Sequence, residues 1–386
     1  MLSERTPRSL LRGKRANRDS APSLQFEDCS AMHRTHSPQL AAGSFNRHRA
    51  TVRPMCVPPP SDEQAGGAQS RFGMEKVHRP VLLRESVHWL GCAPGKRIAD
   101  VTVGLGGHAE AILEACAPDG VLIGLDRDED ALAVARARLD PSRVRLYRAN
   151  AMELPQIMDR EGLSRVDGVL FDLGVSSLQL ETPERGFSFQ SDGPLDMRMD
   201  RRQELTAAHL VNERSEHDLA QILSTYAEER WAVAIAKAIV RARATRPLVK
   251  TRDLVDIVRS AIPARARAAH PHPATRTFQA LRIAVNREME DLAPSLEAAF
   301  SCLTRGGRLV VITFHSLEDR IVKTTMRGWE GTCVCPPGLP ICRCGRRRVA
   351  HVLTPRPLTP APVEVAENPR ARSAKMRVAE RLADTV

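Results

Sequence analysis

The 386-residue sequence lacks long hydrophobic runs, and only 4% of its residues are aromatic. No apolar run reaches the roughly 18 residues that a membrane-spanning helix needs, so a membrane is not expected as a partner. No secretory signal peptide is visible, and the nine cysteines are an odd, unevenly spread set. We therefore expect reduced thiols or a metal site rather than a framework of disulfides.

Acidic residues are fewer than basic ones, with 46 Asp and Glu against 57 Lys and Arg, and the net charge is +11. This balance favours a polyanionic partner, nucleic acid first, although a basic tail would give the same sum. With 386 residues and 42% hydrophobic content, the chain can bury a large core and is expected to form more than one domain.

Apolar periodicity is missing from residues 1–72, which are rich in Arg, Ser, Pro and His. We predict a disordered basic extension that could hold RNA weakly. The composition also fits an organellar transit peptide, which would place the protein in an organellar matrix instead of the cytoplasm. A start at Met74, where folded-looking sequence begins, is a third possibility.

Strands and helices alternate from about residue 77 onward. The predicted strands at residues 98–100, 121–126 and 166–172 end in Asp100, Asp126 and Asp172, and a further strand is predicted at 144–147. Such alternation predicts an α/β, Rossmann-like fold with a parallel sheet, and ligands bind at the carboxyl ends of its strands. The three aspartates are therefore expected at one edge of the sheet.

The alternation stops after residue 172, and we predict a helical insertion over residues 183–295 that recognises the substrate. It separates a first part of the α/β domain, residues 73–182, from a second part, residues 296–386. Apolar residues from Phe278 to Leu292 predict one long helix near the end of the insertion. Sheet pattern resumes over 306–315, with Gly306 and Gly307 expected to end the preceding helix, and 375–378 is a candidate last strand.

The glycine loop after the first strand points to a nucleoside cofactor. Gly104 and Gly106 match the dinucleotide fingerprint, and Asp126 follows Gly104 by 22 residues, where it could bind ribose hydroxyls. A nicotinamide-dependent oxidoreductase is thus one hypothesis. However, Asp100 suits the cationic amino-acid part of S-adenosylmethionine better than a pyrophosphate, which it would repel. The placement of Asp172 at the end of the fourth strand resembles that in amino-methyltransferases, where a polar residue at this edge receives the target amine.

Several segments together resemble the ribosomal small-subunit methyltransferase H family, also called the MraW family. They include Asp100-Val-Thr-Val-Gly-Leu-Gly-Gly-His108 and Asp172-Leu-Gly-Val-Ser-Ser-Leu-Gln179. The others are residues 184–189, 192–200, 272–288, 314–320 and 368–377. The resemblance covers about residues 77–383 and leaves the first 72 residues outside it.

The resemblance implies a class I methyltransferase sheet with an inserted helical domain. It further implies S-adenosylmethionine-dependent methylation of the N4 amino group of cytidine 1402 in 16S ribosomal RNA, either naked or in the assembled small subunit. The cofactor contacts of the family fall on Gly106, Gly107, His108, Asp126, Ala151, Asp172 and Gln179. A non-catalytic RNA-binding assembly factor that keeps the cofactor fold is the second alternative.

Cytosine N4 is a poor nucleophile, because its lone pair is delocalised into the ring. A carboxylate that accepts an N4–H bond would raise its electron density, and Asp172 is the first candidate for this role. Asp196 and His315 are alternative catalytic residues, although a buried histidine with one satisfied hydrogen bond is the simpler interpretation of His315.

The target base must leave its stack to be reached, and aromatic side chains can hold it. Because aromatics are scarce, Phe187 and Phe189 stand out as candidates, with core packing as the simpler interpretation. The candidate phosphate contacts are Arg198, Arg201, Arg202, Arg276 and Arg282.

Four cysteines form two Cys-x-Cys pairs, Cys333 with Cys335 and Cys342 with Cys344, inside a Cys-rich segment at residues 333–344. Four thiolates in this arrangement could bind zinc. Free reduced thiols are the alternative.

Overall fold

The computed structural model describes residues 80–267, 272–331, 335, 344 and 347–382. The predictions for residues 1–72 therefore lie outside the described part of the chain. So do Cys333 and Cys342, two of the four predicted zinc ligands.

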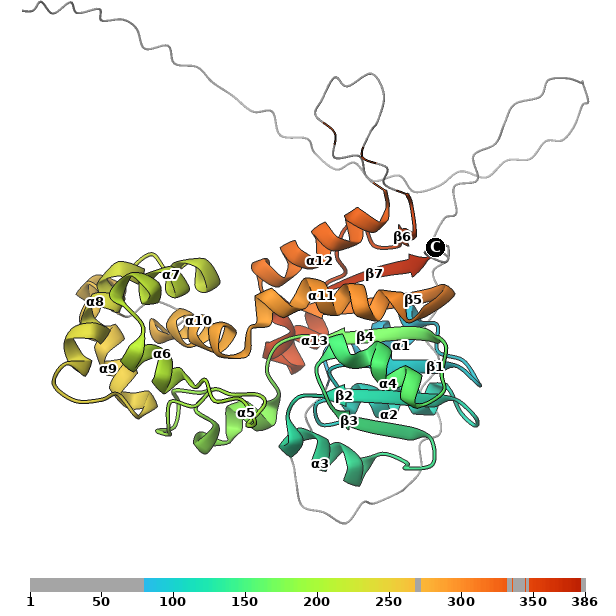
Figure 1. The fold of residues 1–386 in the computed structure, drawn as a ribbon, viewed down its shortest axis with the longest axis horizontal. Coiled ribbons are helices and arrows are strands. Elements are labelled where there is room, and N and C mark those ends of the chain that lie inside the picture. Colours follow the sequence, from blue (N-terminus) through green and yellow to red (C-terminus); the bar gives the residue numbers. More distant parts are fainter. Residues whose placement is uncertain (1–79, 268–271, 332–334, 336–343, 345–346, 383–386) are drawn as a thin grey trace, which may run out of the picture. The chain divides into compact units, whose positions relative to one another are not determined.

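Seven strands of the described residues form one sheet, in the order β3-β2-β1-β4-β5-β7-β6 (Figure 1). Strands β1 to β5 are parallel, whereas β7 runs antiparallel between β5 and β6. The predicted α/β fold with a parallel sheet is confirmed. The strands are β1 (Arg97–Asp100), β2 (Val121–Asp126), β3 (Val144–Arg148), β4 (Val166–Asp172), β5 (Leu303–Thr313), β6 (Ala350–Val352) and β7 (Lys375–Arg381).

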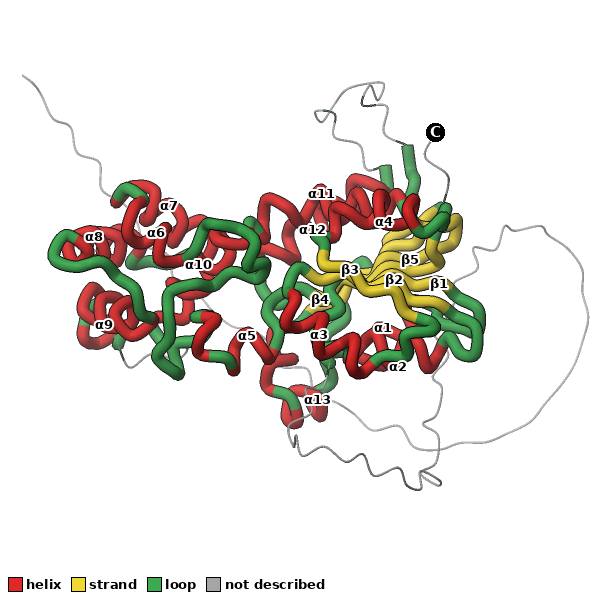
Figure 2. Tube along the Cα trace, turned by 60° about the horizontal axis from the view of Figure 1, so that its bottom comes forward, coloured by secondary structure: helices red, strands yellow, loops and turns green. Residues whose placement is uncertain are grey.

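Helices cover both faces of this sheet (Figure 2). One face packs on α1 (Leu83–Leu90), α2 (Gly107–Ala115) and α3 (Glu129–Arg138), and the other on α4 (Leu154–Arg160), α11 (Glu288–Ser301) and α12 (Ser316–Trp329). Successive residues of a strand face opposite sides. Leu170 and Val310 accordingly belong to the first core, and Val169 and Val311 to the second. Burial on both faces explains why these strands are apolar throughout.

A separate group of helices packs around its own core. It contains α6 (Ala207–Glu213), α7 (Glu216–Ala227), α8 (Ala232–Arg243), α9 (Thr251–Ala261) and α10 (Ala274–Asn286). Leu210, Leu223, Ile235, Leu254 and Leu281 are fully or almost fully buried there. Ser215 begins α7, since its side chain accepts a hydrogen bond from the backbone of Asp218. These helices form the central part of the predicted insertion.

The long helix predicted through Phe278 and Leu292 is two helices in the structure. Arg287 interrupts it with a left-handed backbone, φ 52°, between the end of α10 and the start of α11. Leu292 and Leu296 of α11 lie in the core of the sheet and not in that of the insertion. We therefore propose that the insertion ends near Arg287 instead of residue 295.

Gly306 and Gly307 do not end a helix, contrary to the sequence prediction. The helix α11 ends at Ser301, and both glycines lie within β5. The pairing of β5 with β4 shifts there, because Val166 faces Leu303 while Gly168 faces Arg308. A bulge of this kind needs a residue that tolerates a left-handed backbone, and Gly306 has φ 78°.

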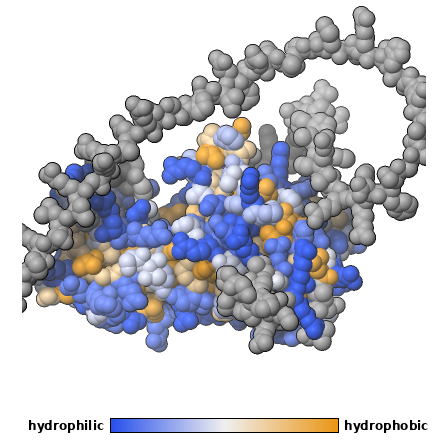
Figure 3. Space-filling view, turned by 90° about the horizontal axis from the view of Figure 1, so that it is seen from above, coloured by the Kyte–Doolittle hydropathy of each residue, from blue (hydrophilic) through white to orange (hydrophobic). Residues whose placement is uncertain are grey.

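Among the described residues, no helix is both long enough and apolar enough to cross a membrane. The face seen in Figure 3 is mainly hydrophilic, with scattered hydrophobic patches. The large hydrophobic side chains exposed in the described part are Val134, Val233, Val249 and Val363.

Candidate functional site

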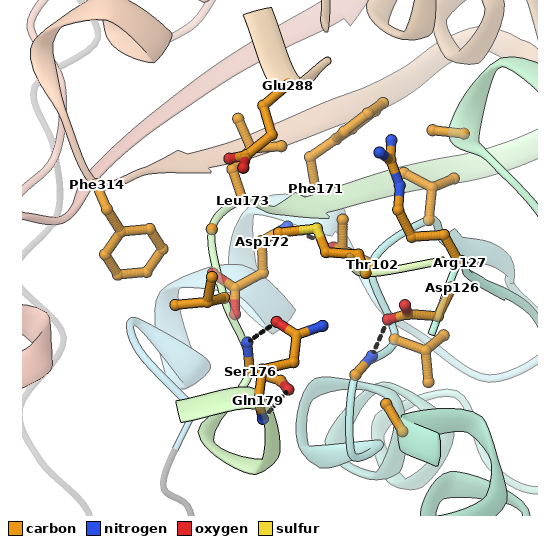
Figure 4. A pocket seen from close by; sticks show the side chains of 18 of the residues that line it. Thr102, Asp126, Arg127, Phe171, Asp172, Leu173, Ser176, Gln179, Glu288 and Phe314 are labelled. Atoms are coloured by element: carbon orange, nitrogen blue, oxygen red, sulfur yellow. Dashed lines mark hydrogen bonds between the residues drawn. The ribbon is translucent and has the colours of Figure 1, made fainter. Parts of the chain in front are cut away.

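A cavity lies at the carboxyl ends of β1, β2, β4 and β5, and α11 forms another of its walls (Figure 4). Asp172 lies between Phe314 and Asp126 in this view, and Glu288 approaches from α11. The charged lining residues are Asp126, Asp172, Glu288, Asp291, Glu318, Arg127 and Arg370, together with His108. The predicted sheet edge is thus a ligand-sized recess whose charged lining residues are mostly acids.

The loop between β1 and α2 forms one side of the cavity. Gly104 and Gly106 have left-handed backbones, with φ of 54° and 84°. A side chain on Gly107 would collide with Pro80, since a Cβ there would lie 2.5 Å from its Cγ. This loop therefore requires glycine for both conformation and packing, and it leaves the start of α2 open to a ligand.

Asp126 holds the glycine loop in place. Its two carboxylate oxygens accept hydrogen bonds from the backbone of Gly104 and of Asp128, each at 2.8 Å. Burial raises the pKa of Asp126 to about 6, although these two hydrogen bonds oppose the rise. Each oxygen keeps a second lone pair, so the carboxylate can still bind two hydroxyl groups of a ribose.

Asp100 lies buried behind the cavity wall and is only 1% exposed. Its Oδ1 accepts a hydrogen bond from the backbone of Thr102 at 3.1 Å, while its Oδ2 has no partner among the described residues. Burial raises the pKa of Asp100 to about 7, and the nearby Asp126 raises it further. A buried oxygen without a partner costs stability, so its retention beside a cavity fits a role toward a cationic ligand.

Asp172 ends β4 and contacts His108 of α2 across the cavity wall. Its Oδ2 lies 3.5 Å from His108 Nδ1, and its Oδ1 is buried without a hydrogen-bond partner in the described residues. Burial raises the pKa of Asp172 well above the ordinary aspartate value, and Asp100 and Glu318 add to the effect. His108 Nε2 lies 3.0 Å from the carbonyl oxygen of Val81. Because a carbonyl only accepts, we assign the proton to Nε2 and leave Nδ1 facing Asp172.

A buried arginine that the sequence analysis missed connects the insertion to this edge. Arg185 forms a two-pronged ion pair with Asp128, at 2.8 and 3.1 Å, and is 2% exposed. It also donates to the carbonyl oxygens of Arg198 and Met199 in the insertion. Since the backbone of Asp128 in turn donates to Asp126, the hydrogen bonds run without a break from the insertion to the glycine loop.

Gln179 lines the cavity as predicted, but its amide is used within the protein. Its oxygen accepts from the backbone of Ser176 at 3.0 Å, and its nitrogen donates to Asp128 at 2.7 Å. It thereby fixes the start of the short helix α5 (Ser177–Glu181) against α3. Ala151, Gly104, Gly107, His108 and Asp126 also line the cavity. The structure thus places most of the predicted cofactor-binding residues in the cavity lining, whereas Asp100 and Gly106 do not line it.

The other predicted site residues do not line the cavity. Asp196 forms an ion pair with Arg198, and Phe187 is buried in the core of the insertion. Phe189 stacks on His272 with ring centres 4.7 Å apart. His315 begins α12 and lies 3.1 Å from Glu318. The four remaining arginines have partners within the protein. Arg201 pairs with Asp130, Arg202 with Asp200 and Arg282 with Glu288, and Arg276 donates to the carbonyl oxygen of Glu228.

The cavity residues that the sequence analysis did not single out include Phe314, Glu288 and Arg370. Phe314 directly follows β5, and the reasoning that selected aspartates at strand ends would have found it. Glu288 reaches the cavity because the predicted helix is interrupted at Arg287 and a separate helix, α11, begins there. The apolar pattern does not show this interruption. Arg370 comes from the short 3-10 helix η4 (Pro369–Ser373), far along the chain.

The described residues contain no group of three His, Cys, Asp or Glu side chains placed to hold a metal ion. Because this finding does not cover Cys333 and Cys342, the zinc site stays a prediction.

The sequence profile of the MraW methylase family matches residues 75–382. The chain belongs to this family. The ribosomal RNA small subunit methyltransferase H of Symbiobacterium thermophilum is 53% identical over 307 residues, which are 79% of this chain and 96% of that protein. The protein of the same name from Geobacter sulfurreducens is 54% identical over 307 residues, 79% of this chain and 99% of its own.

Among solved structures, an rRNA methylase from Streptococcus thermophilus is 12% identical in sequence. The match covers 80% of this chain and 99% of that protein. Its TM-score of 0.34 is too low to support any argument. The sheet of this MraW-family chain is a Rossmann-like class I methyltransferase sheet. The fold and the family support the use of S-adenosylmethionine.

Proposed function

We propose that the protein transfers a methyl group from S-adenosylmethionine to the N4 amino group of cytosine 1402 in small-subunit ribosomal RNA. The observation that carries this proposal is the carboxyl group of Asp172, which ends β4 in the cavity and has a buried oxygen without a partner in the described structure. Membership of a methylase family and relatives named as small-subunit methyltransferases support the substrate class. We propose the cytoplasm as the site of this activity.

The residues around the glycine loop fit S-adenosylmethionine. When bound, it supplies a methyl group on a positively charged sulfur. Asp126 would hold the ribose hydroxyls, and the unpartnered oxygen of Asp100 would receive the ammonium group. Gly104, Gly107 and Ala151 leave room for the rest of the molecule. An acid at the position of Asp100 would repel the pyrophosphate of a dinucleotide, which argues against the oxidoreductase alternative.

Asp172 would act on the target amine. In its ionised form it accepts a hydrogen bond from N4–H, which raises the electron density on nitrogen, and it takes the proton that N4 loses on methylation. A raised pKa makes this carboxylate a stronger base. His108 Nδ1, 3.5 Å away, is placed to take the proton onward. Phe314 offers an aromatic face on the same side of the cavity for an unstacked base.

The decisive experiment measures methyl transfer and its position. Purified protein is incubated with methyl-labelled S-adenosylmethionine and with small ribosomal subunits, or naked small-subunit RNA, that lack the modification. We expect label on N4 of one cytosine, at position 1402. Label on another base, or on none, would refute the proposal, and the second outcome would favour a non-catalytic assembly factor. Calorimetry should show binding of S-adenosylmethionine and not of NAD.

A further inference from the structure

Arg370 places a positive charge on a cavity whose other charged lining is mostly acidic. Five carboxyl groups line this recess, and the arginines that oppose them are Arg127 and Arg370. Arg127 Nη1 donates to the carbonyl oxygen of Asn286 at 2.8 Å, which directs it toward the insertion. Arg370 is therefore the lining arginine on the side of Asp172, because it contacts helix α5, which follows β4 in the chain.

The backbone of Arg370 is held from both sides. The side chain of Asn368 accepts a hydrogen bond from Arg370 N at 3.2 Å, and the neighbouring Ala371 is fully buried against the sheet. The preceding helix α13 (Pro362–Glu367) is fixed to the start of α1, since Glu364 accepts from the backbone of Leu82 at 2.7 Å. A long arginine side chain on a fixed backbone is suited to hold a ligand in one position.

The guanidinium group has two hydrogen-bond partners among the described residues. It donates to the hydroxyl of Ser177 and, at 3.0 Å, to Glu181. The side chains of this ion pair are 44% and 64% exposed. Exposed pairs of this kind contribute little to stability, so a stronger anion can replace Glu181. Ser177 begins α5 five residues after Asp172, and it lines the cavity together with Arg370.

We propose that Arg370 binds the phosphodiester group next to the target cytosine, an inference that rests on the proposed function. A nucleotide whose base enters the cavity must carry its phosphate past a lining of carboxyl groups, which repel it. Arg370 supplies the compensating charge, and its planar fork matches two phosphate oxygens. The hydroxyl of Ser177 beside it adds a further donor.

The experiment compares Arg370→Ala with Arg370→Lys and with Arg372→Ala, in the full chain. Arg372 is an exposed arginine two residues further along η4 that does not line the cavity, so its removal changes the net charge equally. Methyl transfer to small-subunit RNA is measured against RNA concentration at several salt concentrations. Calorimetry gives the affinity for S-adenosylmethionine of each variant.

We expect Arg370→Ala to raise KM for RNA roughly tenfold, as loss of a charged hydrogen bond does, and to lower the salt slope by about one. Arg370→Lys should restore the slope but only part of the affinity, and Arg372→Ala should stay within about twofold of the parent protein. Affinity for S-adenosylmethionine should not change in any variant.

Equal effects of Arg370→Ala and Arg372→Ala would overturn the inference, because they would indicate general electrostatic attraction. A parallel loss of affinity for S-adenosylmethionine would overturn it too, since Arg370 would then act on the fold of the site. If the parent protein transfers no methyl group, the proposed function fails separately. Direct RNA binding by the same variants at the same salt concentrations then decides the role of Arg370.

Discussion

Asp100, Asp126 and Asp172 share one edge of the sheet, and burial raises the pKa of each of them. Three carboxyl groups in so little water are unfavourable for the folded protein on its own. Such an arrangement is typical of a site that a cationic ligand completes. The energetic cost and the proposed activity therefore reside in the same side chains.

Replacement of Asp172 by asparagine should lower kcat for methyl transfer at least about a hundredfold, the usual effect of losing a general base. Binding of S-adenosylmethionine, measured by calorimetry, should change much less. Because the pKa of Asp172 is raised, the rate of the parent protein should fall in acid at a higher pH than an ordinary aspartate would give. Asp196→Asn, outside the cavity, serves as the control; retained transfer by Asp172→Asn would refute the assigned role.

Asp100→Asn should flatten the dependence of stability on pH. The pKa of Asp100 is about 7 in the folded protein against 3.8 as the ordinary value, so the folded state holds its proton more tightly. That contribution is complete below pH 4 and is lost as the pH rises toward 7 and above. Between pH 5 and pH 8, the free energy of unfolding measured in urea should therefore change by roughly 2–3 kcal/mol less in the variant than in the parent protein. An unchanged difference would show that Asp100 titrates normally.

The sequence allowed the three aspartates to be placed together, because parallel strands bring their carboxyl ends to one edge. It did not reveal which side chains line the cavity. Asp196 and Phe187 have suitable chemistry, yet the segment after Pro183 folds into the core of the insertion. Arg370 reaches the cavity through long-range packing, which no local pattern records.

At the level of elements, Arg185 joins the insertion to α3 and the sheet. Its partner Asp128 begins α3 by accepting a hydrogen bond from the backbone of Asp130. Both members of the pair are almost completely buried, with side chains 2% and 3% exposed. The ion pair thus joins the insertion to the start of α3.

Arg185→Ala should lower the free energy of unfolding by about 3–5 kcal/mol, because Asp128 would remain buried and charged without its partner. Arg136→Ala, which removes an exposed pair with Glu129, should cost less than about 1 kcal/mol. Adding Asp128→Asn to Arg185→Ala should cost less than the sum of the two single changes in urea unfolding. Strict additivity would show that the two side chains are not coupled.

Two element boundaries were wrong for the same reason. Apolar residues continue at helical spacing across Arg287, so the pattern cannot show that the backbone turns there. Gly306 and Gly307 carry the residue type of a helix end, but a bulge in β5 needs the same freedom. Sequence periodicity indicates which side of a segment is buried. The turn at Arg287 and the bulge at Gly306 depend instead on the elements that pack against them.

The whole molecule consists, in its described part, of a sheet core and an insertion core connected beside one cavity. A ligand that binds there stabilises the folded state by an amount that grows with the logarithm of the ratio of its concentration to its Kd. S-adenosylhomocysteine, the reaction product, at about 100 times its Kd should add about 2.7 kcal/mol, which raises Tm by a few degrees. NAD at the same concentration should leave Tm unchanged in a thermal unfolding scan. An equal shift with NAD would support the oxidoreductase alternative.

The antiparallel strand β7 also has a consequence for the timing of synthesis. It covers the edge of β5, and Arg381 at its end donates to the carbonyl oxygens of Phe300, Ser301 and Leu303. On a nascent chain, β5 emerges from the ribosome some sixty residues before β7. Until then, a strand with buried Val310 and Val311 keeps an open hydrogen-bonding edge, which can pair with other chains. Synthesis of β7 is therefore the step that closes the open edge of β5.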